Sequence, residues 1–432
     1  MKDISILLKT VLLAFLTVLA VSCEKKWDTS EWPAIPEVPD PMPNTGNYEV
    51  SGGKISHEVL NNYLSRAVTE AEFLCSEGLS NDGDYGKEDD ERMLLNIGAK
   101  FIGRSIYVWN HEELFLNDDW LGNAEEKIDR MLTKDPDLMF QAGMFETVST
   151  KVNDIPVPEW VFEAFGKTAE KRNFNFDSMK DENNVFVGQW GNGTCVPDMS
   201  REETRMWFYY MAVRYMEIGI EAFHLGQVML MASMGDSDAD YAGFSDLFSR
   251  IRQAAATKAR RGTVIFDGHL TNGGIVIDGN HLFDFTSFPL RAKEVSGEPI
   301  KAELKKGFND CIIGYTKAGV TPSGWYCERL PYILEFDNFG MGVPGDSSLS
   351  DAFVWGYDEI SWFSQLDDSE EQEWLKYAFD YLNRVDPVGY IEVPGLRVSV
   401  GGKDPFYRCN TASDACPEGR SLENTIKELW SR

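Results

Sequence analysis

Residues 332–337 read Tyr-Ile-Leu-Glu-Phe-Asp (YILEFD), a short apolar run that ends in two acids. Side chains alternate along a β-strand, so Leu334 and Phe336 point one way while Glu335 and Asp337 point the other. The segment TVIFDGH, residues 263–269, has the same pattern, with Asp267 and His269 on one face. Both segments predict strands that pack an apolar face outward against helices and turn their acids inward.

Six further segments have the length and apolarity of strands: 101–109, 138–146, 219–227, 282–288, 352–359 and 389–393. Helical patterns fall between them at 123–134, 201–217, 240–260 and 370–384. Eight strands alternating with helices over roughly 300 residues predict an α/β fold, a (β/α)8 TIM barrel. We expect an N-terminal helical extension (57–71), an insertion around 147–200 and a C-terminal helix (422–430). An open, doubly wound sheet is the second interpretation.

The composition limits the classes of function. The chain has 432 residues, with 70 Asp and Glu against 41 Lys and Arg, which gives a formal charge of −29. A surface of this sign repels phosphate backbones, which excludes general nucleic-acid binding. The hydrophobic share of 43% predicts a large buried core, and the aromatic share of 12% favours a surface on which a ligand stacks.

The first 50 residues predict export and anchoring. Residues 1–22 resemble a secretory signal, and small residues lead directly into Cys23, as in the cleavage box of bacterial lipoproteins. Five prolines follow within residues 33–43, so residues 23–50 are predicted to be a tether and residues 51–432 the barrel domain. We expect lipidation at Cys23 and a location at the outer membrane or cell surface; an ordinary secreted protein is the alternative.

Six cysteines remain after Cys23, and an exported protein permits disulfides. Cys409 and Cys416 are the easiest local pair, but fifteen connectivities are possible and the sequence does not choose among them. Isolated buried thiols are the alternative for the others.

Motifs for cofactors and metals are incomplete. Gly340-Met-Gly342-Val-Pro-Gly345 matches GxGxxG, but Pro344 and the polar residues after it favour a loop over the helix that a dinucleotide site needs. His57-Glu58 and His111-Glu112 lack the second histidine of HExxH. The acids at 82–84 and 236–240 resemble fragments of calcium loops; solvated turns or helix caps are the favoured interpretation of both, and a calcium site in the first run is the alternative. We therefore predict no cofactor and no metal.

Acids at strand ends are the remaining candidates for chemistry, because barrel active sites form at the carboxyl ends of the strands. Two carboxylates are the minimum for glycoside hydrolysis, one as acid and one as nucleophile or base. The predicted catalytic residues are Glu335, Asp337, Asp267 and Glu146. The predicted substrate-binding residues are His224, His269, Glu221, Asp358, Glu359, Trp109 and Trp355. Acids at strand ends also cap helices, so at least half of such residues are expected to have no catalytic role.

The Leu19-Ala-Val-Ser-Cys23 box with its proline-rich tether resembles surface lipoproteins of gut Bacteroidetes, many of which handle glycans. Four segments resemble barrel-type, glycoside-hydrolase-like lipoproteins of that group: GIEAFHLGQV (219–228), VIFDGHL (264–270), YILEFDNFG (332–340) and VWGYDEISWF (354–363). No defined catalytic motif of a glycosidase family matches, so the resemblance assigns no residue a role.

These observations predict an exported, membrane-anchored glycoside hydrolase with a carbohydrate as its ligand. A glycan-binding lipoprotein without catalysis is the alternative, and a structural or adhesive surface protein is a third. A cleft with two facing carboxylates favours the first, a shallow aromatic platform the second, and the absence of both the third.

Overall fold

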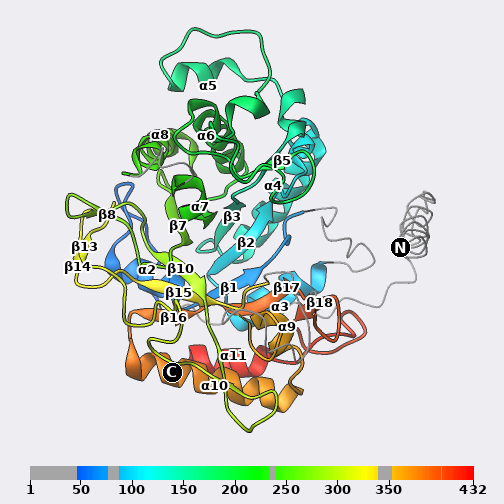
Figure 1. Cartoon of the computed structure of the whole chain (residues 1–432). Coiled ribbons are helices and arrows are strands. Elements are labelled where there is room, and N and C mark those ends of the chain that lie inside the picture. The colour runs from blue at the N-terminus through cyan, green and yellow to red at the C-terminus, as the bar shows by residue number, and fades with distance from the viewer. Residues whose placement is uncertain (1–45, 76–86, 234–239, 339–352, 400) are drawn as a thin grey trace, which may run out of the picture. The chain divides into compact units, whose positions relative to one another are not determined.

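A curled sheet of ten strands forms the centre of the computed structural model (Figure 1). The structure describes residues 46–75, 87–233, 240–338, 353–399 and 401–432. The order of the strands is β16-β15-β10-β7-β6-β3-β2-β1-β17-β18, and only the last pair is antiparallel. Their bounds are β1 Ala67–Glu70, β2 Phe101–Tyr107, β3 Met139–Met144, β6 Ala222–Gln227, β7 Ile265–His269, β10 Thr286–Pro289, β15 Tyr332–Glu335, β16 Gly389–Ile391, β17 Val393–Val398 and β18 Phe406–Arg408.

One run of chain pairs with both edges of the parallel sheet. Strand β16 pairs with β15 and β17 pairs with β1, and only Glu392 separates β16 from β17. The backbone N–H of Glu392 donates to the carbonyl of Leu334, so pairing continues across this residue. From β1 to β15 the strand order follows the sequence without a reversal. A doubly wound sheet requires such a reversal, so the described strands do not form one.

Six helices follow strands of the sheet: α3 Glu88–Ile97, which the sequence patterns did not predict, α4 Asp118–Lys134, α6 Glu202–Glu217, α8 Ala242–Lys258, α10 Asp368–Val385 and α11 Glu423–Trp430. Helix α10 illustrates why such segments form helices. Asp367 and Glu370 form a capping box at its start, and Trp374, Ala378 and Leu382 recur on one buried face. Figure 1 shows α10 and α11 side by side, where they contact each other.

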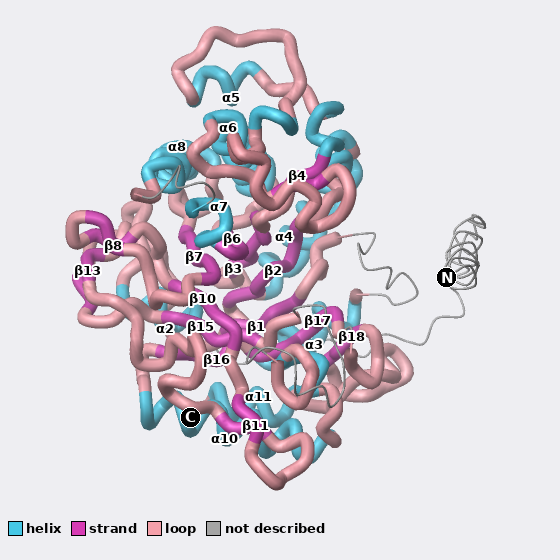
Figure 2. The backbone as a smooth tube through the Cα atoms, viewed as in Figure 1, coloured by secondary structure: helices cyan, strands magenta, loops and turns pink. Residues whose placement is uncertain are grey.

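Shorter elements fill the connections. The insertion between β3 and α6 contains β4 Val148–Ser149, η3 Thr150–Asp154, α5 Glu159–Ala164, η4 Phe176–Ser178 and β5 Thr194–Cys195. The other short helices are α2 His57–Leu64, η2 Glu112–Leu116, α7 Val228–Ser233 and α9 Glu359–Phe363. Residues 270–331 hold short strands and no α-helix (Figure 2): β8 Val276–Ile277, β9 Asn280–His281, β11 Lys293–Glu294, β12 Ala302–Glu303, β13 Gly319–Val320 and β14 Tyr326–Cys327. Beyond β7 and β10, hairpins and loops therefore take the place of the helices of a regular barrel.

Two apolar clusters lie on opposite faces of the curled sheet. Leu334 and Phe336 belong to the larger cluster under the outer helices, whereas Ile333 belongs to a smaller inner one, as the alternation predicts. The inner cluster takes one residue from each of seven strands or their flanks, packed against α2: Ala67, Phe101, Met139, Ala222, Ile265, Phe285 and Ile333. Tyr48 and Leu60 belong to the same cluster, so α2 and the segment before it close the amino-terminal end of the sheet. Tyr48 thus packs with the domain although the predicted tether extends to residue 50.

Two predicted elements are wrong. The helix predicted over 57–71 ends at Leu64, and residues 67–70 are strand β1 instead. This segment is strand because β2 and β17 pair with it on both sides. The strand predicted over 352–359 is a turn in its described part, with one isolated bridge between Val354 and Tyr357. Trp355 and Gly356 both have positive φ there, which is incompatible with an extended strand.

All six cysteines after Cys23 are buried, and the structure forms no disulfide among them, the predicted pair Cys409 and Cys416 included. Within the described residues, no helix is long and apolar enough to cross a membrane. The predicted signal, Cys23, the acids at 82–84, Asp236 and Asp238, and the GxGxxG stretch 340–345 lie outside the described residues.

Candidate active site

A cavity of about 560 Å³ lies at the carboxyl ends of the parallel strands, where barrel active sites form. Residues at the ends of β1, β2, β3, β6 and β7 and just after β15 line it, together with the end of β17. Its aromatic residues are Tyr107, Trp109, Phe145 and Trp190; its acids are Glu72, Glu146 and Asp337; and its basic residues are Arg104, His111, His224, His269 and Arg397.

Glu146 follows the end of β3 and is held by the backbone of the next strand. Its Oε2 accepts a hydrogen bond of 2.9 Å from the N–H of Gln227. A Cβ atom at Gly226 would fall 1.8 Å from this oxygen, so only glycine leaves room for the carboxyl group. Burial raises the pKa of Glu146, against the opposing effect of the hydrogen bond from Gln227. A raised pKa favours the protonated form of a carboxyl group, which is the form that donates a proton.

Asp337 follows β15 on the other side of the cavity. Its Oδ1 lies 3.7 Å from Nη2 of Arg397, and its side chain is 17% exposed. The N–H of Asp337 donates to Glu359 Oε2 at 3.1 Å, so Glu359 fixes this end of the strand. Strands β6, β7 and β10 lie between β3 and β15 in one direction along the sheet. In the other direction lie β2, β1 and the run 389–398, which contains β17 and β16. Glu146 and Asp337 therefore line one cavity from strands that have three other strands between them.

Glu335 lies beneath the cavity and is neutralised by Arg104. Arg104 adopts a φ of +53° at an irregularity in the β2–β3 pairing, a strained conformation that proteins retain mainly near functional sites. Its guanidinium forms a buried ion pair with Glu335. Burial opposes ionisation of Glu335, but the charges of Arg104 and His269 outweigh it and hold the pKa well below its usual value. Glu335 is thus a buried carboxyl group whose ionised form Arg104 stabilises.

Asp267 also lies beneath the cavity and does not line it. The Nδ1–H of His224 donates to its Oδ2 at 2.8 Å, and Nε2 of Gln141 donates to its Oδ1 at 2.6 Å. Burial raises the pKa of Asp267 to about 7, and burial lowers the pKa of His224 well below its usual value. Both groups are satisfied by hydrogen bonds, as buried polar side chains require.

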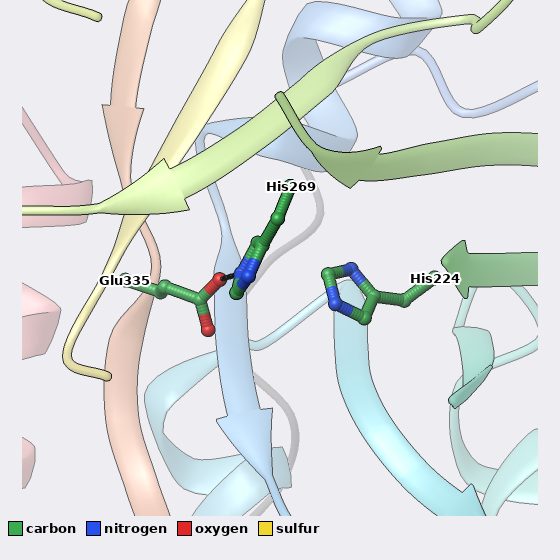
Figure 3. Close-up of side chains that lie close together, drawn as sticks. All are labelled: His224, His269 and Glu335. Carbon is green, nitrogen blue, oxygen red and sulfur yellow. Dashed lines mark hydrogen bonds and ion pairs between the residues drawn. The ribbon is translucent and has the colours of Figure 1, made fainter. Parts of the chain in front are cut away.

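His224, His269 and Glu335 converge in a way that could hold a metal ion (Figure 3). The guanidinium of Arg104, however, lies among them: its Nη2 is 3.1 Å from Nε2 of His224, 3.0 Å from Nε2 of His269, and paired with Glu335. Because arginine only donates and stays protonated, a cation already occupies the centre of the group. The residues present fit a hydrogen-bonded arginine rather than a metal.

The four aromatic residues of the cavity form one group, which we call the aromatic wall: Tyr107, Trp109, Phe145 and Trp190. The ring centres of Trp109 and Trp190 are 5.4 Å apart, and Phe145 lies 5.6 Å from Trp109 and 5.1 Å from Tyr107. Nε1 of Trp190 donates to the carbonyl of Glu146 at 3.0 Å. The wall therefore stands beside Glu146, and the lining residues after β15 and β17 include no aromatic side chain.

The structure separates the predicted site residues into three groups. Glu146, Asp337, His224, His269 and Trp109 line the cavity. Glu335 and Asp267 lie beneath it and are bound by Arg104 and His224. The other four are elsewhere: Glu221, Asp358, Glu359 and Trp355.

The structure places these four residues outside the lining of the cavity, each bound to other parts of the chain. Glu221 precedes β6 and is bound by Arg260 and Arg261. Asp358 is the N-cap of α9, and Glu359 hydrogen-bonds to backbone N–H groups. Nε1 of Trp355 donates to the carbonyl of Lys301.

The sequence patterns did not reveal Glu72, Arg104, Trp190 and Arg397, which all line the cavity. Arg104 and Arg397 gave a usable signal, because each is a charge inside an otherwise apolar strand segment. Glu72 lies just beyond the segment predicted as helix, and Trp190 lies in the insertion, where no periodicity assigns a side chain to a face.

No protein-family model matches the sequence, and no curated protein is significantly similar to it. Among solved structures, the chain is similar to a debranching enzyme from Nostoc punctiforme, at 11% identity and a TM-score of 0.42, over 86% of this chain and 80% of that one. It is also similar to endo-glycoceramidase II from Rhodococcus sp., at 9% identity and a TM-score of 0.35, over 84% of this chain and 79% of that one.

An alpha-galactosidase from Thermus thermophilus matches at 15% identity and a TM-score of 0.26, over 42% of this chain and 34% of that one. These neighbours are glycoside hydrolases.

Proposed function

We propose that this chain is a glycoside hydrolase in which Glu146 is the general acid and Asp337 the nucleophile or base. The observation that carries the proposal is that these two carboxylates line one cavity from strands with three others between them, which in a closed barrel places them on opposite sides. Burial raises the pKa of the first, which favours its protonated form, and the second lies near Arg397. Glycoside hydrolysis needs one protonated and one ionised carboxyl group flanking the scissile bond.

The scaffold that we infer is a closed (β/α)8-type barrel whose eighth strand is the run 389–398. Its support is the pairing of β16 with β15 and of β17 with β1. In such a barrel the polar residues beneath the cavity hold its lining residues in place: Glu335 binds Arg104, and Asp267 binds His224. The place of the protein, held at the outer membrane or cell surface by a lipid on Cys23, is a proposal from the sequence alone.

In the proposed reaction, the proton of Glu146 passes to the glycosidic oxygen as the bond from that oxygen to the anomeric carbon breaks. The Asp337 carboxylate either attacks the anomeric carbon or takes a proton from the water that does so. In the first case water then attacks the glycosyl–Asp337 ester: its hydroxyl group joins the sugar, its proton goes to Glu146, and Asp337 leaves as a carboxylate. In the second case the hydroxyl group of water joins the sugar and its proton goes to Asp337; exchange with solvent then removes that proton and reprotonates Glu146. Because the acid must be protonated, activity should fall as the pH rises through the raised pKa of Glu146.

The test is release of reducing sugar from a panel of polysaccharides and oligosaccharides by the purified chain. We expect cleavage of at least one substrate, and Glu146→Gln should lower kcat/KM by roughly 10²–10⁴-fold. The same variant should retain activity on a dinitrophenyl glycoside of the same sugar, because that leaving group needs no proton. Asp337→Asn should lose activity on both substrates.

Glu328→Gln is the matched control, since this exposed carboxylate lies in a different hollow of the surface, beside Tyr326. Full activity in both Glu146→Gln and Asp337→Asn would refute the assignment. The second candidate, a glycan-binding protein without catalysis, is favoured by the aromatic wall. It would be the correct one if oligosaccharides bind to the chain and none is cleaved.

A further inference from the structure

The aromatic side chains of the cavity are distributed unevenly. All four belong to β2, the segments after β2 and β3, and the insertion that begins beyond β3. Trp190 is tied to the backbone of Glu146 by a hydrogen bond of 3.0 Å, and Phe145 precedes Glu146 in the sequence. On the side of Asp337 the lining consists of Asn338, Arg397 and Val398. One side of the cavity therefore offers flat apolar rings and the other offers hydrogen-bonding groups.

The position of the general acid decides which part of a substrate faces each side. A general acid donates its proton to the oxygen that leaves, so the leaving group lies on the side of the acid. The sugar whose anomeric carbon reacts lies toward the nucleophile or base. If Glu146 is the acid, the leaving group must lie against the residues beside Glu146, which are the aromatic wall.

We propose that Trp109 and Trp190 form the binding subsite for the leaving group, and that this group is a sugar residue whose C–H face stacks on the two rings. The inference rests on the proposed function and extends it, since it assigns substrate specificity to particular side chains. A sugar ring has an apolar face and a hydroxyl rim, so it matches a flat ring set beside polar groups. Both tryptophans are partly exposed and so are accessible to a ligand.

The experiment compares two substrates that carry the same reacting sugar. One is the oligosaccharide cleaved by the wild-type chain, and the other is the corresponding glycosyl fluoride, whose leaving group has no ring. Trp109→Ala should lower kcat/KM for the oligosaccharide by about tenfold, a loss typical of a buried aromatic anchor. The same variant should hydrolyse the glycosyl fluoride within about twofold of wild type, and Trp109→Phe should recover most of the loss.

Tyr326→Ala is the matched control, because this side chain is 64% exposed and lies outside the cavity. The subsite assignment is overturned if Trp109→Ala lowers both activities equally, since the wall would then hold the reacting sugar, or if it lowers neither. An inactive wild-type chain would instead overturn the proposed function, so the two failures are distinguishable. Trp190→Ala provides the second variant, with Trp109→Phe showing that a folded chain can carry a change in the wall.

Discussion

At the scale of single residues, the site depends on two glycines that leave space for neighbouring side chains. Gly226 and Gly143 both lie where a Cβ would meet a neighbour: Oε2 of Glu146 at 1.8 Å and the Phe145 ring at 2.7 Å. Neither glycine has a positive φ, so space and not backbone conformation requires them. The two positions therefore leave the volume in which Glu146 and the aromatic wall are arranged.

The prediction at this scale concerns Gly226. In Gly226→Ala the methyl group must displace the Glu146 carboxyl group, so we expect kcat/KM to fall at least about tenfold, because a displacement near 1 Å at the reacting groups is costly. Michaelis kinetics on the substrate found in the panel checks this. Gly122→Ala is the control, since nothing lies within 4 Å of its added Cβ on helix α4. Equal activity in the two variants would show that Glu146 is not held at this position.

At the scale of elements, helix α2 closes the inner cluster at the amino-terminal end of the sheet. Ser56 caps the helix by accepting from the N–H of Val59, and Val59, Leu60, Tyr63 and Leu64 are buried. This face packs against the inward apolar residues of the strands. The helix thereby covers the end of the sheet opposite the cavity. The helix has only eight residues, so tertiary packing must stabilise it.

We therefore predict that Leu60→Ala destabilises the whole chain. Leu60 is fully buried, and loss of a buried leucine side chain costs roughly 2–5 kcal/mol of unfolding free energy. Chemical denaturation followed by tryptophan fluorescence measures the change. The exposed neighbour Glu58 gives the control, because Glu58→Gln should shift the free energy by no more than about 0.5 kcal/mol. A similar small effect for Leu60→Ala would mean that α2 does not seal the sheet.

At the scale of the whole molecule, buried carboxyl groups dominate the response to pH. Burial raises the pKa of Asp267, Glu371 and Glu392 to about 7 and that of Glu359 to about 8. The folded chain therefore binds more protons than the unfolded chain between about pH 4.5 and 8, so stability must fall as the pH rises through this range. The lowered pKa values of two buried histidines, His224 and His281, act in the opposite direction but are outnumbered.

We expect a melting temperature on the order of 5 °C higher at about pH 5 than at about pH 8. Repulsion within a chain of net charge −29 acts in the same direction, because fewer carboxylates are ionised at the lower pH. Thermal unfolding across this range tests the expectation, and Glu392→Gln should reduce the slope, since it removes one of the titrating groups. A melting temperature that is equal or higher at the upper end of the range would contradict it.

The sequence by itself determined the local features. Alternation of apolar and polar residues placed Leu334 and Phe336 outward and Glu335 inward, and 3.6-residue periodicity located the long helices α6, α8 and α10. Both patterns depend on the geometry of a single strand or helix and are therefore present in the linear chain. They were sufficient to predict a parallel sheet with acids at its carboxyl ends.

Only the tertiary structure decided which acids share a cavity. Glu146 and Asp337 lie 191 positions apart in the sequence and line the same cavity because β3 and β15 belong to one curled sheet. Strand β1 escaped prediction because four residues carry too little pattern, and pairing with β2 and β17 supplies its stability. In the sequence Glu335 and Asp337 are equally suitable as catalytic carboxyl groups. In the structure Arg104, from a distant strand, forms an ion pair with Glu335, and such a partner sets the charge of a buried carboxyl group.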